Sequence, residues 1–319
     1  MPEEILDVEN LQSYYFTRAG IIKAVDKVSF RMSRGETLSL VGESGCGKST
    51  LGFSILRLIP PPGRIVGGKI IFESSDLTAK SESEMREIRG KRISLIFQDP
   101  MTSLNPLMKI GDHLTETITT HINITKEEAV EKAKVLLSNL GILPERIADY
   151  PHQFSGGMRQ RVGIGLALAL DPDLVIADEP TTSLDVIVEA QILELLKEMK
   201  KAYNLTLILI THNIGIVAEM ADRIAVMYAG KIVELSDALS LFDKPLHPYT
   251  KALLKSIPNI KLSEQTLESI PGMPPDLLSP PKGCRFNPRC PYAFKECFER
   301  EPELTQVGKD RFVACHLQG

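Results

Sequence analysis

The chain has 319 residues, of which 43% are hydrophobic and 24% charged, and its formal net charge is −4. These values are typical of a globular protein of about two domains and exclude a fibrous or largely disordered chain. Aromatic residues reach only 6% and tryptophan is absent, so neither a basic surface nor stacking rings favour nucleic acid as a partner.

The sequence contains no apolar run close to the roughly 18 residues that a membrane-spanning helix needs. The run from Leu205 to Ile210 has six residues, which is the length of a strand. The acidic N-terminus, MPEEILDVEN, lacks the charged and then apolar pattern of a secretion signal. We therefore expect a soluble chain in the cytoplasm.

The first hundred residues predict strands and turns around one helix. Alternation of apolar and polar residues indicates a half-buried strand, and short apolar runs indicate buried ones. A run of three prolines and a glycine from Pro60 ends the helix. The pattern predicts strands at 22–32, 37–41 and 93–97 and a helix at 48–58.

From about residue 106 to 170 the periodicity becomes helical. Thr125 and Glu128 form a capping-box pattern, and Ser155 is a plausible N-cap. Strands then alternate with helices, which predicts a mostly parallel sheet covered on both faces. Past about residue 236 prolines are frequent and the sheet pattern stops. The predicted elements are helices at 126–140, 156–170 and 186–203, strands at 174–177 and 205–210, a helical insertion at about 100–165, and a C-terminal appendage.

A glycine-rich segment between the strand at 37–41 and the helix at 48–58 fits the P-loop pattern. Its glycines let backbone N–H groups turn toward one phosphate, and the helix N-terminus adds its dipole. Lys48 would reach the β- and γ-phosphates, and the Ser49 hydroxyl suits Mg²⁺. The thiol of Cys46 is expected to be incidental. The segment comprises Gly42, Glu43, Ser44, Gly45, Cys46, Gly47, Lys48 and Ser49.

Two further segments carry chemistry. An apolar strand ends at Asp178, whose carboxylate would orient Mg²⁺, and the adjacent Glu179 is a candidate general base for the attacking water. Ser155, Gly156 and Gly157 begin a helix and form a second phosphate-binding pattern. Because one ATP needs only one P-loop, this second site is predicted to serve a nucleotide held by another subunit.

Together these motifs resemble the ATP-binding subunits of ABC transporters over about residues 5 to 235. The order is P-loop, Gln98, SGGMRQ, Asp178-Glu179, Ser183-Leu184-Asp185 and His212. The sequence FSGGM stands where that family has LSGGQ, and the Ser-Gly-Gly core is unchanged.

The resemblance implies roles for the matching residues. Tyr15 would stack on adenine, with Tyr14 as the competing choice, and Thr50 would join the P-loop in binding ATP. Gln98 would touch Mg²⁺ and the attacking water, and His212 would contact the γ-phosphate. Asp185 would communicate across a dimer. The signature Ser155, Gly156 and Gly157 would close over ATP on the opposing subunit.

The resemblance also implies an α/β fold: a P-loop NTPase (RecA-like) core with an antiparallel β subdomain, a helical insertion and an irregular, metal-binding C-terminal extension. The expected domains are a nucleotide-binding domain at 1–235, with its helical subdomain at about 100–165, and the extension at 236–319.

The extension resembles that of the dipeptide/oligopeptide importer ATPases, which include nickel-importing relatives. The similar segments are HPYT from His247, PGMPP from Pro271 and the run from Gly283 to Cys290. The resemblance implies ATP hydrolysis that drives peptide uptake from the cytoplasmic face of the membrane. The implied partners are two transmembrane permeases, a related second ATPase subunit and, indirectly, an extracytoplasmic solute-binding protein.

Four of the five cysteines lie in the extension, with the spacing C-x₅-C-x₆-C-x₁₇-C. Clustering in a cytosolic chain favours metal over disulfides, and the spacing is looser than in zinc knuckles. The resemblance implies a 4Fe-4S cluster, with zinc and metal-free thiols as alternatives, and His247 and His316 are expected to be structural. The cluster is expected to be remote from the ATP chemistry. The cysteines are Cys284, Cys290, Cys297 and Cys315.

Two other functions stay open from the sequence. A soluble ABC ATPase of the repair or translation type would need no membrane partner, but such proteins usually carry two cassettes or a long coiled-coil insertion. An importer of nickel or another small solute, with redox regulation through the tail cluster, is the second alternative.

Overall fold

The computed structural model describes residues 3–99, 104–182, 184–256 and 270–318. The chain forms two compact units, one made of residues 1–79 and 210–319 and the other of residues 80–209. We call them unit 1 and unit 2. The predicted Ser183 lies outside the described residues.

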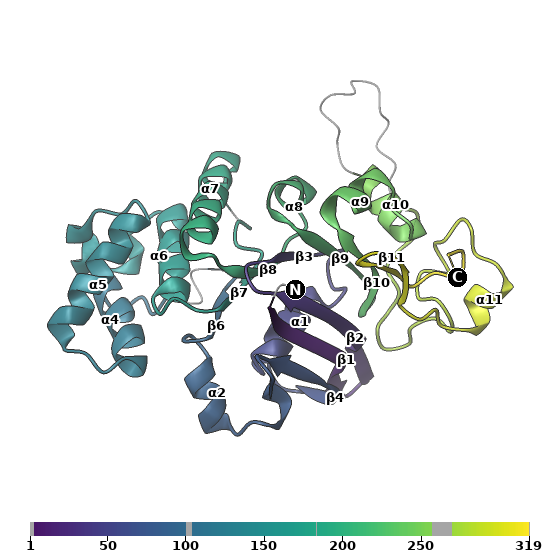
Figure 1. The fold of residues 1–319 in the computed structure, drawn as a ribbon, viewed down its shortest axis with the longest axis horizontal. Coiled ribbons are helices and arrows are strands. Elements are labelled where there is room, and N and C mark those ends of the chain that lie inside the picture. Colours follow the sequence, from purple (N-terminus) through teal and green to yellow (C-terminus); the bar gives the residue numbers. More distant parts are fainter. Residues whose placement is uncertain (1–2, 100–103, 183, 257–269, 319) are drawn as a thin grey trace. The chain divides into compact units, whose positions relative to one another are not determined.

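Unit 1 contains an antiparallel sheet with the strand order β2-β1-β4-β5 (Figure 1). This sheet confirms the expected antiparallel β subdomain. Its pairing has irregularities, including one between Val8 and Leu11, where Asn10 has a left-handed φ of 47°. The strands are β1 (Glu4–Thr17), β2 (Gly20–Ser33), β4 (Gly63–Phe72) and β5 (Ser75–Asp76).

A second group of strands in unit 1 has the order β11-β12-β10-β9-β3. Strands β3 and β9 are parallel, whereas β9, β10, β12 and β11 are antiparallel. Strand β3 is buried along its whole length, in agreement with the predicted buried strand at 37–41. The strands are β3 (Thr37–Val41), β9 (Arg223–Tyr228), β10 (Lys231–Asp237), β11 (Thr305–Gly308) and β12 (Arg311–Val313).

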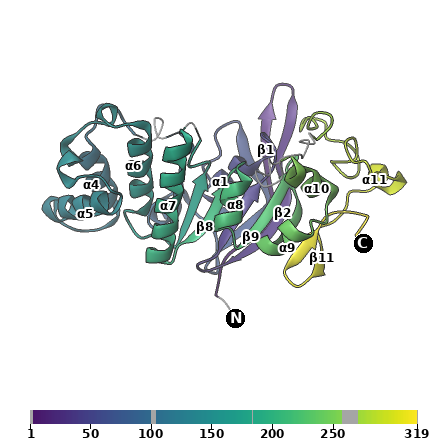
Figure 2. The same cartoon turned by 90° about the horizontal axis from the view of Figure 1, so that it is seen from above.

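The helices of unit 1 cover these strands on two sides. Helices α8, α9 and α10 lie over β3, β9 and β10 on one face, and α1 lies on the other face with the antiparallel sheet (Figures 1 and 2). The helices are α1 (Lys48–Ile55), α8 (Ile214–Met220), α9 (Ala238–Asp243), α10 (Pro248–Lys255), α11 (Lys295–Glu299) and the short 3₁₀ turn η1 (Leu77–Ala79).

Helix α1 ends at Ile55, three residues before the predicted Leu58. Arg57 adopts a left-handed φ of 52°, which breaks the helix before the proline run is reached. Its guanidinium donates to the carbonyl oxygen of Leu77 at 3.1 Å. The helix thus ends before the proline run, at a residue whose side chain contacts the turn at Leu77.

Unit 2 combines three strands in the order β8-β7-β6 with a group of helices. The parallel pairing of β6 and β7 agrees with the predicted parallel sheet. Thr125 and Glu128 form the predicted capping box, and the helix at 186–203 has the predicted bounds. The elements are α2 (Glu82–Ile88), β6 (Ile93–Ile96), α4 (Ile110–His121), α5 (Lys126–Asn139), η2 (Pro144–Ala148), η3 (Pro151–Gln153), α6 (Gly156–Leu168), β7 (Leu174–Asp178), α7 (Val186–Tyr203) and β8 (Thr206–Ile210).

The expectation that sheet structure stops past residue 236 is wrong. Strands β11 and β12 form a hairpin in the tail, and β12 pairs with β10 through Glu234 and Val313. Arg285 of the tail also forms a buried ion pair with Asp26 of β2. Tyr249 and Phe286 enter a buried core with Tyr228 and residues of β9 and β10. The C-terminal extension thus shares the core of unit 1.

Candidate nucleotide-binding site

Unit 1 holds the glycine-rich loop between β3 and α1. Gly42 has φ 151°, and a Cβ there would lie 2.1 Å from the carbonyl oxygen of Met227. Gly47 has φ 106°, and a Cβ there would lie 2.0 Å from the carbonyl oxygen of Ala24. No side chain in the described part of the chain caps α1 at Gly47. The loop therefore presents backbone N–H groups and a helix N-terminus, which suit an anion.

Lys48 lies folded over this loop. Its side chain is only 5% exposed, and its Nζ donates to the carbonyl oxygens of Gly42 at 2.8 Å and Glu43 at 3.1 Å. A phosphate would replace these carbonyls as the acceptor of the ammonium group. Burial raises the pKa of the Cys46 thiol, so the thiol is uncharged at neutral pH, as its expected incidental role requires.

The two candidate adenine partners are in different surroundings. The Tyr15 hydroxyl lies 3.4 Å from Oγ1 of Thr50 in α1. The Tyr14 hydroxyl instead donates to Asp26 at 2.7 Å, and burial raises its pKa. The structure thus places Tyr15 beside the P-loop helix and engages Tyr14 in an ion-pair network.

Unit 2 brings the candidate base and Gln98 together. Strand β7 ends at Asp178, which is 3% exposed, and Glu179 follows with a left-handed φ of 46°. Oε2 of Glu179 accepts a hydrogen bond from Nε2 of Gln98 at 3.0 Å and another from Oγ1 of Thr182 at 2.8 Å. Thr182 was not singled out from the sequence, although its place three residues after the candidate base is a usable signal.

The signature residues begin α6 as predicted. Ser155 is the N-cap, and its hydroxyl accepts a hydrogen bond from the Met158 amide at 3.3 Å. A Cβ at Gly157 would lie 2.4 Å from Cγ1 of Val188, so this position requires the absence of a side chain. Gly156 is half-buried. The helix start is tightly packed on one side and open to solvent at Ser155.

Asp185 caps the next helix of unit 2. Its Oδ1 accepts hydrogen bonds from the amides of Ile187 at 3.1 Å and Val188 at 3.0 Å. The following Val186 and Ile187 are 80% and 72% exposed. The side chains of Val186 and Ile187 therefore lie largely in solvent at the start of α7.

His212 lies in unit 1 just after β8. It is exposed, and the amide of the preceding Thr211 donates to the carbonyl oxygen of Leu40 in β3 at 3.3 Å. Asn213 caps α8 by accepting from the Gly215 amide. His212 is thus held next to the strand that leads into the P-loop.

The cysteine tail reaches the glycine-rich loop directly. Arg289 forms an ion pair with Glu43, and the Glu43 amide donates to the Tyr249 hydroxyl at 2.9 Å. The tail therefore contacts one of the nucleotide motifs, while the remoteness of the cysteine cluster from the ATP chemistry stays a prediction. Neither Arg289 nor Tyr249 was assigned a role from the sequence, because nothing in their neighbouring sequence links them to a loop about 200 residues earlier.

The four tail cysteines are free thiols that line one small enclosed cavity of about 10 Å³. Burial, with a smaller contribution from the neighbouring cysteines, raises the pKa of Cys284 to about 11. His247 lines the same cavity. Burial lowers the pKa of His247 to about 3. Among the described residues no group of three or more His, Cys, Asp or Glu side chains is arranged to hold a metal ion.

The two tail histidines make structural contacts, as expected. His247 caps α10 by accepting from the Tyr249 amide at 3.0 Å, and Nε2 of His316 lies 2.9 Å from the carbonyl oxygen of Arg300. Nε2 of His247, however, is buried and has no hydrogen-bond partner within the described parts of the chain. This nitrogen is therefore available to a metal ion or ligand bound in the cysteine cavity.

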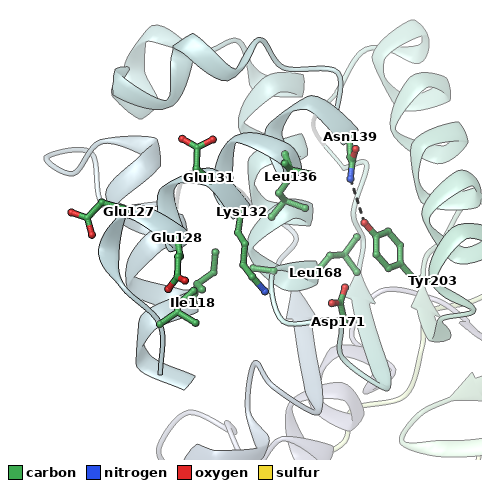
Figure 3. A pocket seen from close by; sticks show the side chains of 13 residues that line it. Ile118, Glu127, Glu128, Glu131, Lys132, Leu136, Asn139, Leu168, Asp171 and Tyr203 are labelled. Carbon is green, nitrogen blue, oxygen red and sulfur yellow. Dashed lines mark hydrogen bonds between the residues drawn. The ribbon is translucent and has the colours of Figure 1, made fainter. Parts of the chain in front are cut away.

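A larger hollow lies in unit 2 among α4, α5 and the end of α7 (Figure 3). Its volume is about 670 Å³, and Asn139 donates to Tyr203 at 3.4 Å across part of its wall. Glu127, Glu131 and Asp171 give the hollow an acidic rim. None of the predicted nucleotide residues lines it.

None of the helices among the described residues combines the length and the apolar character that crossing a bilayer demands.

Two protein families match the chain. Residues 25–182 match the family described as ABC transporter, and residues 233–297 match the one described as oligopeptide/dipeptide transporter, C-terminal region. The first match includes the P-loop, Gln98, the signature and Glu179. The second begins within β10 and includes three of the four tail cysteines.

Known proteins resemble the chain over nearly its whole length. The oligopeptide transport ATP-binding protein OppD of Bacillus subtilis is 51% identical and is matched over 98% of this chain and 88% of its own length. The dipeptide transport ATP-binding protein DppD of Escherichia coli is 44% identical over 98% and 96%. Among solved structures, the dimeric ATP-binding cassette MJ0796 bound to ADP and phosphate is similar with a TM-score of 0.66 and 26% identity, covering 73% of this chain and 98% of that one.

Proposed function

This chain belongs to the ABC transporter family, in its oligopeptide and dipeptide branch, and we propose that it hydrolyses ATP to drive peptide uptake through separate permease subunits. It has the fold of an ATP-binding cassette. The observation that carries the catalytic part is the Glu179 carboxylate, held by Gln98 and Thr182 at the end of a buried strand.

Residues of unit 1 bind the nucleotide in this proposal. Backbone amides of the glycine-rich loop other than that of Glu43, together with the N-terminus of α1, surround the phosphates, and Lys48 neutralises them. Tyr15 stacks on adenine beside Thr50. His212 contacts the γ-phosphate.

The remaining chemistry needs Mg²⁺ and a base. Ser49 and Asp178 supply a hydroxyl and a buried carboxylate, the oxygen ligands that Mg²⁺ prefers, with Gln98 as a further oxygen donor. Bound Mg²⁺ neutralises charge that develops on the phosphates. Glu179 accepts the proton of the attacking water, and Gln98 orients its carboxylate.

Peptide transport is tested by reconstituting the chain in vesicles with its permeases, its second ATPase subunit and the solute-binding protein. We expect peptide uptake that depends on ATP and is lost in Lys48→Ala, since the loop then lacks its phosphate-binding cation. Nickel uptake instead of peptide uptake would contradict the peptide assignment, and ATPase activity indifferent to the permeases would favour a non-transport ATPase.

The active form in this proposal is a dimer of cassettes, with a related but distinct ATPase subunit as the partner. Ser155, Gly156 and Gly157 of one subunit close over ATP held by the P-loop of the other, and Asp185 communicates across the contact. The exposed Val186 and Ile187 beside Asp185 support a covered surface there. The dimer would lie at the cytoplasmic face of the membrane against two permeases.

A dimeric site predicts that turnover depends on the partner. We expect the ATPase rate per chain to be low in the isolated chain and to rise at least about tenfold when the partner cassette is added, because each site lacks its signature without it. Steady-state phosphate release at a series of protein concentrations measures this. A rate per chain that is the same at every concentration, with and without the partner, would rule the composite site out.

The proposed modules are a nucleotide-binding part at 1–235, with its helical part at about 100–165, and a C-terminal extension at 236–319. Within the extension we assign a metal site to Cys284, Cys290, Cys297 and Cys315. Four free thiols that line one cavity support this assignment, because thiolates are the ligands that soft metals prefer. A 4Fe-4S cluster is the favoured occupant and zinc the alternative; either would crosslink the tail, and the first could also make it redox-sensitive.

A further inference from the structure

The loop between the first two tail cysteines carries an arginine that reaches the glycine-rich loop. Arg289 directly precedes Cys290, and its side chain is 4% exposed. Its NH1 donates to Oε2 of Glu43 at 2.7 Å, and its NH2 donates to Oε1 at 2.9 Å. This is a two-pronged pairing of a guanidinium with a carboxylate, which fixes direction as well as charge.

The guanidinium of Arg289 makes further hydrogen bonds, which fix its position. Nε donates to the carbonyl oxygen of Pro271 at 2.9 Å, and NH1 also donates to the Tyr228 hydroxyl at 3.2 Å. NH2 donates in addition to the carbonyl oxygen of Ile270 at 3.3 Å. The hydrogen bond to Glu43 further raises the already high pKa of Arg289. The guanidinium is therefore a fixed cation in a nearly buried place.

A rigid aromatic platform supports this contact. The rings of Tyr228, Tyr249 and Phe286 are fully buried and lie 4.5 to 5.5 Å apart between centroids. Tyr249 also accepts the hydrogen bond from the Glu43 amide. The side chain and the backbone of Glu43 are thus both held by residues outside the nucleotide motifs.

The negative charge of Glu43 would affect phosphate binding by the glycine-rich loop. Glu43 belongs to the loop whose amides and lysine would receive the phosphates, and an uncompensated carboxylate there would repel them. Arg289 cancels that charge and keeps the carboxylate turned toward the tail. Since Lys48 Nζ donates to the Glu43 carbonyl oxygen at 3.1 Å, movement of Glu43 would also move a partner of the phosphate-binding lysine.

We propose that Arg289 is a positioning residue of the nucleotide site, which neutralises and holds Glu43 so that the C-terminal extension sets the affinity of the glycine-rich loop for nucleoside di- and triphosphates. The inference rests on the proposed function, because it assumes that this loop binds ATP. It assigns a role in nucleotide binding to the extension, independent of whether the tail cysteines hold a metal.

The test measures the Kd for Mg·ADP of the full chain by equilibrium titration, together with its Tm. Arg289→Met keeps most of the side-chain volume and removes the cation, and we expect about tenfold weaker binding because the Glu43 carboxylate then faces the phosphates. Glu43→Gln combined with Arg289→Met should recover most of the lost affinity, because the carboxylate that repels the phosphates is then absent.

Arg311→Met is the matched control. Arg311 also lies in the tail and pairs with a buried carboxylate, that of Glu234 at 3.4 Å, but it does not contact the glycine-rich loop. It reports the effect of losing a tail ion pair as such. Arg289→Gln removes the cation but keeps an amide donor, and it should also bind Mg·ADP several-fold more weakly than the wild type, which covers the case in which Arg289→Met does not fold.

Two results would overturn the inference. The first is that the affinity of Arg289→Met, or of Arg289→Gln if only that variant folds, falls no further for a given loss of Tm than the affinity of Arg311→Met does. The second is a double variant as weak as Arg289→Met, because the Glu43 charge would then play no part. Failure of the proposed function looks different: the wild type itself would not bind Mg·ADP, or Lys48→Ala would bind it equally well.

Discussion

Replacing Glu179 by glutamine should abolish turnover while ATP binding persists. The glutamine side chain has the same shape, and its amide oxygen can still accept from Gln98 and Thr182, so the local structure is retained. It cannot take a proton from water. We expect kcat to fall by about 10²- to 10⁴-fold, the usual contribution of a general base.

The same variant should accumulate as an ATP-bound dimer with its partner, because the step that opens the composite site no longer occurs. Size-exclusion chromatography with Mg·ATP detects the dimer, and a filter assay detects retained nucleotide. Glu189→Gln is the control: Glu189 also accepts a threonine hydroxyl, from Thr181 at 3.0 Å, but follows no metal-binding strand. Wild-type turnover in Glu179→Gln would refute the assignment of the base.

Local patterns in the sequence predicted most of unit 2. The capping box at Thr125 and the period of residues 186–203 determine helices through neighbours three and four residues apart, so a single sequence is enough. In the first strand the alternation is broken by the irregularity around Asn10, where φ is 47°. The glycines at 67 and 68 likewise interrupt the alternation of apolar and polar residues in strand β4, so the sequence pattern did not predict this strand.

The contacts of the tail could not be predicted in this way. Strands β11 and β12 have only four and three residues and acquire their partner from β10, far earlier in the chain. Arg289 and Glu43 are separated by 246 positions. A pairing over that distance leaves no periodic signal in the sequence. The local pattern is enough to assign a residue to a motif, but it does not show which distant residue will contact it.

Loss of one tail cysteine should release the proposed metal and destabilise unit 1. Serine is a poor ligand for soft metals, so we expect Cys290→Ser to lose most of the iron and sulfide, or the zinc, found in the wild type. Because the tail shares a core with β9 and β10, its loosening should lower Tm by about 5 °C or more. Metal and sulfide analysis of anaerobically purified protein, with thermal melting, measures both effects.

Cys290 and Cys315 form a matched pair for locating the consequence of metal loss. Cys290 follows Arg289, which holds Glu43, whereas Cys315 follows Ala314, whose amide donates to Val233 in β10 at 2.9 Å. Both variants should lose metal, but only Cys290→Ser should also weaken Mg·ADP binding several-fold, because the disturbance passes directly to Arg289.

Colourless wild-type protein with one zinc per chain would reject the iron–sulfur cluster and retain the thiolate site. Wild-type protein without metal, with a Tm unchanged by either substitution, would reject the site altogether and leave the ion pair with Glu43 as the tail's link to the nucleotide loop.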